Sequence, residues 1–131
     1  MRRLSQSACA VLVALGLSGC GDSERNVILD TSPFYVQRLP AFSESDSDRV
    51  IQEVKNYARE KRMDFLLSRD GPDVGDFNAT AAARDINLKA LHVKATGGGL
   101  ELLAYARQTP TAENRKQVRE FVCRVARDCR S

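Results

Sequence analysis

Beyond residue 31 the apolar positions repeat with two different periods, one typical of helices and one typical of strands. The clearest helical stripe has apolar residues at i, i+4, i+7 and i+8, namely Val50, Val54, Tyr57 and Ala58. Serines and acids fill residues 43–48 just before it, where side-chain oxygens cap free N–H groups and negative charge meets the helix dipole. The pattern predicts a helix over residues 46–62.

A second helical stripe follows further along the chain. Its apolar positions fall at i, i+3, i+4 and i+7, namely Val118, Phe121, Val122 and Val125. Residues 109–113 open it with the sequence Thr-Pro-Thr-Ala-Glu. Proline is tolerated in the first turn of a helix because its missing N–H has no partner there. We therefore expect a second amphipathic helix.

Alternation between apolar and polar residues marks the strands. Phe34 and Val36 share one face of a first predicted strand, which Pro40 ends. Residues 65–68 form a short second strand, and residues 77–83 form an alanine-rich third strand. Alanine is uncommon in strands, so the third is the weakest of these predictions.

The best hairpin signal surrounds the three glycines at 97–99. Before them, apolar residues alternate first from Ile86 and then, in the opposite phase, from Leu91. After them the alternation resumes at Leu100, Leu102, Ala104 and Ala106. The change of phase near Lys89 predicts a bulge or a kink. The glycines themselves are expected to form a hairpin turn, since neither a Lys-Ser/Thr pair nor a helix follows as a phosphate-binding loop requires.

These elements occur in the order β-α-β-β-β-β-α, or with one strand fewer. Runs of strands with a helix near either end are typical of α+β proteins, in which helices gather on one face of an antiparallel sheet. We expect a two-layer α+β sandwich, with a mainly antiparallel sheet of four or five strands and both helices packed on one face.

The first 20 residues have a different pattern. Arg2 and Arg3 precede an apolar run of 10 residues, 8–17. That run is too short to span a bilayer, which takes about 20 apolar residues, but it fits the apolar region of a signal peptide. The following Leu-Ser-Gly-Cys, residues 17–20, resembles the lipobox of bacterial lipoproteins, in which an aliphatic residue and two small residues precede the lipidated cysteine.

The resemblance implies that Cys20 carries a diacylglyceryl group and often an N-acyl chain such as palmitate, which together anchor a protein stably in a membrane. Gly21 rather than Asp follows Cys20, which favours the periplasmic leaflet of the outer membrane, although Asp22 keeps the inner membrane open. We expect a signal peptide at 1–19, a lipidated cysteine and tether at 20–31, and a periplasmic domain at 32–131. Within the tether, the apolar residues 27–29 are expected to dock on the domain.

Charge narrows the choice of partner. The formal net charge is +3, from 20 Lys and Arg against 17 Asp and Glu, and it falls to +1 once Arg2 and Arg3 leave with the signal peptide. A near-neutral domain in this compartment does not indicate a nucleic-acid partner. The remaining cations concentrate on the last helix, in Arg115, Lys116, Arg119, Arg124 and Arg127. They form either a solvated face or a face for an anionic partner: a lipid headgroup, a lipopolysaccharide phosphate or an acidic protein surface.

The four cysteines have separate roles. Cys9 leaves with the signal peptide, Cys20 is the lipid site, and Cys123 and Cys129 are expected to form a disulfide in the oxidising periplasm. Six residues of unbroken helix rise roughly 9 Å, more than the about 7 Å that a disulfide spans between Cα atoms. The bridge therefore requires the helix to end near Val125 or Ala126. Free thiols or an intermolecular bond are the alternatives.

Few other residues suggest chemistry. His92 is predicted to be a surface or edge histidine of the hairpin, and with two cysteines it lacks the fourth ligand of a zinc site. Asp70, Asp73 and Asp76 lie in a predicted solvated turn without the order of an EF-hand loop. We predict no catalytic residues, no metal and no cofactor.

The sequence thus favours a non-enzymatic binding or structural module of the cell envelope, anchored to the membrane through the lipid on Cys20 and with a possible protein partner. An inhibitor or immunity-type protein that blocks an envelope-directed enzyme is the first alternative. A small envelope hydrolase is the second, and it would use His92 or the loop at residues 70–76.

Overall fold

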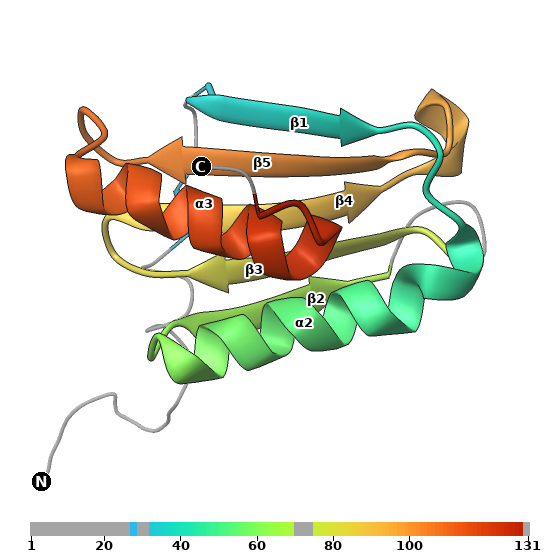
Figure 1. The fold of residues 1–131 in the computed structure, drawn as a ribbon, viewed down its shortest axis with the longest axis horizontal. Helices are drawn as coiled ribbons and strands as arrows, with labels where there is room; N and C mark the ends of the chain where they lie inside the picture. The colour runs from blue at the N-terminus through green and yellow to red at the C-terminus, as the bar shows by residue number, and fades with distance from the viewer. Residues whose placement is uncertain (1–26, 29–31, 70–74, 130–131) are drawn as a thin grey trace, which may run out of the picture.

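One antiparallel sheet of five strands carries two α-helices on one of its faces (Figure 1). The structure, a computed structural model, describes residues 27–28, 32–69 and 75–129. The strands are β1 (Tyr35–Leu39), β2 (Asp64–Ser68), β3 (Phe77–Ala82), β4 (Ile86–His92) and β5 (Leu100–Ala106). The helices are α2 (Ser47–Glu60) and α3 (Ala112–Ala126), with short 3-10 turns η1 (Glu44–Asp46) and η2 (Lys94–Thr96). This is the α+β sandwich predicted from the hydrophobic pattern.

The strand order is β1-β5-β4-β3-β2, and every neighbouring pair is antiparallel. Strands β2 to β5 therefore follow one another across the sheet, while β1 joins the far edge beside β5. Helix α2 connects the two edges, from the end of β1 to the start of β2. It packs mainly on β2 and β3, and α3 packs on β4 and β5 (Figure 1).

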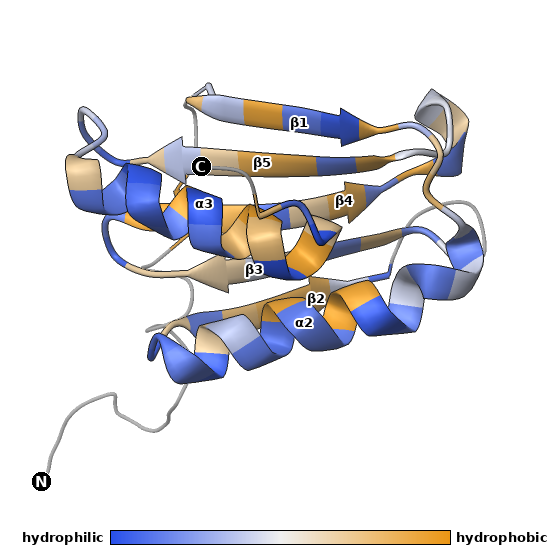
Figure 2. Ribbon diagram, in the orientation of Figure 1, coloured by the Kyte–Doolittle hydropathy of each residue, from blue (hydrophilic) through white to orange (hydrophobic). Residues whose placement is uncertain are grey.

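The core lies between the helices and the sheet. Both predicted helical stripes are buried there, with the small Ala79 and Ala81 of β3 beneath α2 and the larger Leu88 and Leu102 in the middle of the sheet. Figure 2 shows both helices banded along their length, with hydrophilic and hydrophobic residues in alternation. The alanines of β3 suit this position, because small side chains let a helix approach a sheet closely.

The predicted phase of the first strand is wrong. Val36 is 47% exposed on the side of β1 away from the helices, whereas Tyr35, Gln37 and Leu39 point toward the helix layer and are half-buried. The register explains the difference. Tyr35 pairs with Ala104 and Leu39 with Leu100, and both partners are core residues of β5. Because paired residues share a face, the pairing places the odd-numbered positions of β1 inside.

The predicted bulge near Lys89 is also absent from β4. Its pairing is continuous with β5 over the whole strand and with β3 from Asn87 to the strand's end at His92. Ala90 and His92 continue the inward face that Ile86 and Leu88 begin. The apolar residues that suggested a second phase lie on the opposite face, as Leu91 does, or in the turn that follows.

Candidate functional site

The cysteine pair shapes the end of α3. Cys123 and Cys129 are bonded, with 4.1 Å between their Cα atoms. The helix ends at Ala126, and Arg127 adopts a left-handed conformation (φ 56°) that turns the chain back toward Cys123. This is the helix end that a bridge between these two residues requires. Cys20, the predicted lipid site, lies outside the described residues.

The predicted cationic face divides into two parts. Arg115, Lys116 and Arg119 are exposed on α3, and Arg127 is exposed just beyond the helix. Arg124 does not join them, because its guanidinium makes two 2.8 Å hydrogen bonds to the Glu60 carboxylate and lies 5.7 Å from the centre of the Tyr57 ring. Arg124 therefore links α3 to α2, while the remaining cations face solvent.

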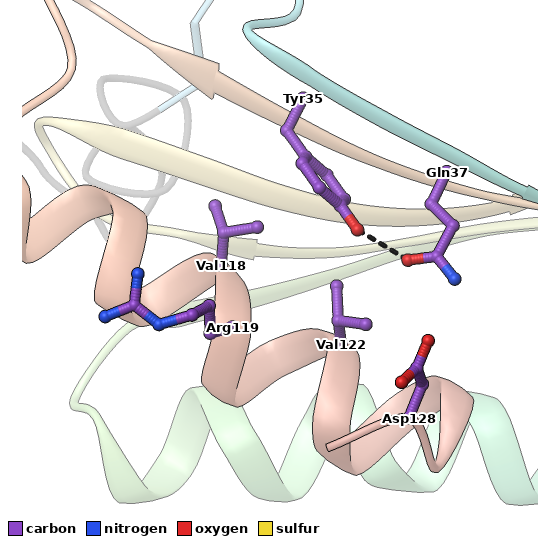
Figure 3. Close-up of a pocket in the computed structure, with 6 residues that line it drawn as sticks. All are labelled: Tyr35, Gln37, Val118, Arg119, Val122 and Asp128. Atoms are coloured by element: carbon purple, nitrogen blue, oxygen red, sulfur yellow. Dashed lines mark hydrogen bonds between the residues drawn. The ribbon is translucent and has the colours of Figure 1, made fainter. Parts of the chain in front are cut away.

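A groove lies between strand β1 and helix α3 (Figure 3). The two helices cover the sheet only as far as β5, so the inward side of β1 at the sheet edge has no helix over it (Figure 1). The groove has a volume of about 230 Å³. Its lining, which defines what we call the β1–α3 groove, comprises Tyr35, Gln37, Val118, Arg119, Val122 and Asp128.

The β1–α3 groove combines an apolar floor with charged ends. Val118 and Val122 rise from α3 toward the Tyr35 ring, and the Tyr35 hydroxyl donates a hydrogen bond to the Gln37 side-chain oxygen (Figure 3). Arg119 stands at one end and Asp128 at the other. Such a groove suits an extended segment whose apolar side chains fill the floor and whose charged groups meet those at the two ends.

The structure corrects the prediction of a surface histidine. His92 is only 2% exposed, and its ring packs against those of Phe42 and Phe77, with centroids 5.1 and 5.8 Å away. Nδ1 is 3.1 Å from the carbonyl oxygen of Gly99. Because a carbonyl only accepts hydrogen bonds, Nδ1 is the donor in this contact. Nε2 has no hydrogen-bond partner in the described part of the chain.

Charged groups surround the Nε2 side of this ring. The nearest oxygen of Glu44 is 3.9 Å from Nε2 and 2.9 Å from the Lys94 ammonium. The hydrogen bond from Lys94 holds the pKa of Glu44 below its ordinary value, which burial would otherwise raise. Asp76 is 3% exposed and accepts a 3.0 Å hydrogen bond from the Lys94 backbone N–H, so the predicted solvated turn is wrong at this residue. Asp70 and Asp73 lie outside the described residues.

This histidine–carboxylate cluster of Glu44, Asp76, His92 and Lys94 was missed by the sequence reasoning. A signal was present, since His92 continues the inward alternation of β4 two residues after Ala90. Across residues 27–28, 32–69 and 75–129, however, no group of three or more His, Cys, Asp or Glu side chains is placed to hold a metal ion. No serine, threonine or cysteine of these ranges bonds to His92.

Part of the predicted tether lies on the sheet. The backbone N–H of Ile28 donates a 2.8 Å hydrogen bond to the side-chain oxygen of Asn87, on the sheet face opposite the helices. Residues 27 and 28 thus dock as expected, and Leu29 lies outside the described residues. None of the described helices is both long enough and apolar enough to cross a membrane.

Similarity to known proteins assigns no family. The chain matches no protein-family model, no curated protein and no solved structure. A functional proposal therefore depends on the N-terminal motif and on the surfaces described above.

Proposed function

We propose that this chain is a lipoprotein of the bacterial cell envelope, anchored through Cys20 in the periplasmic leaflet of the outer membrane, whose domain binds a protein partner without catalysing a reaction. The lipobox-like residues 17–20 support the anchor. The β1–α3 groove supports the binding role, and it is the observation that carries the proposal.

Strand β1 makes this groove suitable for an extended segment. It pairs with β5 on one side and has no strand on its other side among the described residues, so backbone groups along that edge are available to a further strand. Addition of a peptide to a sheet edge gives affinity through main-chain hydrogen bonds, while pockets for alternate side chains give specificity. Tyr35 and Gln37, which point into the groove, line such pockets.

Charge indicates the kind of segment. Arg115 and Arg119 are one helical turn apart on α3, and Lys116 is adjacent, so three exposed cations lie along the helix that forms one wall. Charge complementarity of this kind steers a partner and selects against those with the wrong sign. We infer that the partner presents an acidic, partly apolar segment of an envelope protein. Asp128 would repel a second acidic group at its own end of the groove.

The hydrolase alternative would use His92 with Glu44, the histidine and carboxylate that the fold brings together. Catalysis at a histidine needs a nucleophile or a substrate within hydrogen-bond reach of the ring. The His92 ring is enclosed by Phe42 and Phe77 instead. The binding role is therefore the better supported of the two.

Site-specific crosslinking in native membranes tests the binding role. A photo-crosslinking residue at Gln37, inside the groove, should capture a defined partner, and the same residue at Gln52 on the exposed side of α2 should not. Arg119→Glu should abolish the product from position 37, whereas Arg59→Glu, the same charge change on α2, should leave it intact. Equal crosslinking from positions 37 and 52, or a product insensitive to Arg119→Glu, would contradict the proposal.

A further inference from the structure

The sheet face opposite the helices, which we call the outer face, has a lysine at its centre. Lys89 lies on β4, the middle strand, and the register aligns it with Thr80 on β3 and Leu103 on β5. Continuing the same row to both edges adds Leu66 on β2 and Val36 on β1. A single cation thus stands in a row that is otherwise apolar except for one hydroxyl.

No carboxylate neutralises this cation in the described part of the chain. Its only interaction there is with the face of the Tyr105 ring, whose centre is 5.4 Å from Nζ. On the same face, Glu101 is bonded to Arg38 at 3.0 Å, and Asp64 lies on β2, two strands away. Lys89 is half-buried, and burial without a compensating charge lowers its pKa. A partly desolvated ammonium with three N–H donors and no anion is energetically costly.

A cleft of about 290 Å³ opens beside this ammonium. Its apolar lining includes Val27, Ile28 and Leu66. Its polar lining includes Asn78 and Thr80 on β3 and the half-buried Tyr105 on β5, which stand on either side of the strand that carries Lys89. The Thr80 hydroxyl donates to the Asn78 side-chain oxygen at 3.3 Å, which leaves the Asn78 NH₂ group oriented by that bond and able to donate to a ligand.

We propose that this cleft binds a small carboxylate with a short aliphatic tail. The carboxylate would take the uncompensated charge of Lys89 and accept hydrogen bonds from its ammonium and from the Asn78 amide. The tail would lie on Val27, Ile28 and Leu66. One cation matches one negative charge, and the cleft lies at the small end of the range for ligand sites, which are mostly apolar with a few oriented polar groups. The proposal does not depend on the partner at the β1–α3 groove.

Calorimetric titration of the protein purified from membranes in detergent tests this site with three probes. Hexanoate has both the charge and the tail, acetate has the charge alone, and hexanol has the tail alone. We expect hexanoate to bind at least about tenfold more tightly than hexanol, because a hydrogen bond to a charged group contributes about that factor or more. We expect a similar advantage over acetate, because acetate lacks the apolar CH₂ groups that would lie on the apolar lining. Hexanol binding as tightly as hexanoate would overturn the proposal, and so would no detectable hexanoate binding at millimolar concentration.

Variants then locate the site. Lys89→Gln should weaken hexanoate binding about tenfold or more. Lys55→Gln, the same substitution at an exposed lysine of α2, should leave it unchanged. In the unaltered protein, hexanoate should also slow acetylation of Lys89 but not of Lys55, measured by mass spectrometry, so that the assignment does not depend on the folding of a variant. Equal loss in both variants, or equal protection of both lysines, would refute the assignment to Lys89.

Discussion

At the scale of single residues, the Glu44 carboxylate lies between the buried His92 ring and the Lys94 ammonium, near the end of β4. Glu44 lies in η1, far from Lys94 in sequence, yet its carboxylate bonds the ammonium at 2.9 Å and faces Nε2 of His92 at 3.9 Å. Gly75 makes room for it, because a Cβ built at that position would lie 2.7 Å from the Glu44 carboxylate. The backbone there has φ +102°, a conformation that favours glycine. The carboxylate is therefore held between a lysine, a histidine and a glycine.

This contact predicts a dependence of stability on pH. Lys94 lowers the pKa of folded Glu44 below its ordinary value of 4.5. The stabilisation is thus present above about pH 4.5 and is lost as the pH falls through the lower folded value. Between about pH 5 and about pH 3 the unaltered protein should lose more of its free energy of unfolding than Glu44→Gln does, measured by urea titration. Parallel losses in the two proteins would show that Glu44 contributes nothing to this dependence.

At the scale of elements, the helices and the inward alternation of β5 were predictable, and the phase of β1 was not. The apolar stripes of α2 and α3 repeat over about two helical turns, so their period identifies one buried face. Phe34, Tyr35 and Val36 are instead consecutive apolar residues, which fit either face of β1. The pairing with β5 decides which of them points inward, and that pairing joins residues nearly 70 positions apart, as Tyr35 and Ala104 are. Period alone cannot supply a long-range register.

The start of α3 rests on a capping box, which gives a prediction for that element. The Thr111 hydroxyl accepts from the Asn114 N–H, and the Asn114 side-chain oxygen accepts from the Thr111 N–H, both at 3.0 Å. Thr111→Ala should lower the free energy of unfolding by about 1 kcal/mol, because it leaves a helix N–H without its partner. Thr109→Ala, two residues earlier and exposed, serves as the matched control. Denaturant titration should separate the two variants, and equal stability would mean that the cap contributes little.

The other end of α3 gives a chemical prediction. Because Cys123 and Cys129 are bonded to each other, alkylation of the purified protein without reductant should modify neither, and alkylation after reduction should modify both. Mass spectrometry of the peptide that contains both residues distinguishes these results. Two alkylated cysteines before reduction would show that the thiols are free, and a disulfide-linked dimer would show that they pair between molecules.

The candidate site was only partly predictable for a related reason. The sequence marks Arg115, Lys116 and Arg119 as helix cations, but it marks Arg124 in the same way. Only the structure shows that Arg124 is paired with Glu60, 64 residues earlier. The β1–α3 groove depends on which strands the helices cover, and the cleft beside Lys89 depends on strand pairing and on where residues 27–28 lie. Both are properties of the packed sheet, so no local pattern contains them.

At the scale of the whole molecule, the proposed anchor and the docked tether together limit where the domain lies. Only six residues lie between Cys20 and Val27. Even fully extended, the chain spans about 25 Å between the Cα atoms of Cys20 and Val27, and Ile28 is bonded to Asn87 on the outer face of the sheet. An acylated Cys20 would therefore keep the outer face close to the membrane. The helices and the β1–α3 groove would then lie on the side of the sheet that faces away from the membrane. A partner would then approach from the periplasm.

The anchor is the claim on which this arrangement depends, and metabolic labelling tests it most directly. Cells that express the full-length chain are grown with a clickable palmitate analogue, and the protein is isolated and examined for label. We predict strong labelling of the unaltered protein and of Cys9→Ala, whose cysteine lies in the proposed signal peptide, and no labelling of Cys20→Ala. Equal labelling of Cys20→Ala, or no labelling of the unaltered protein, would contradict the assignment of this chain as a lipoprotein.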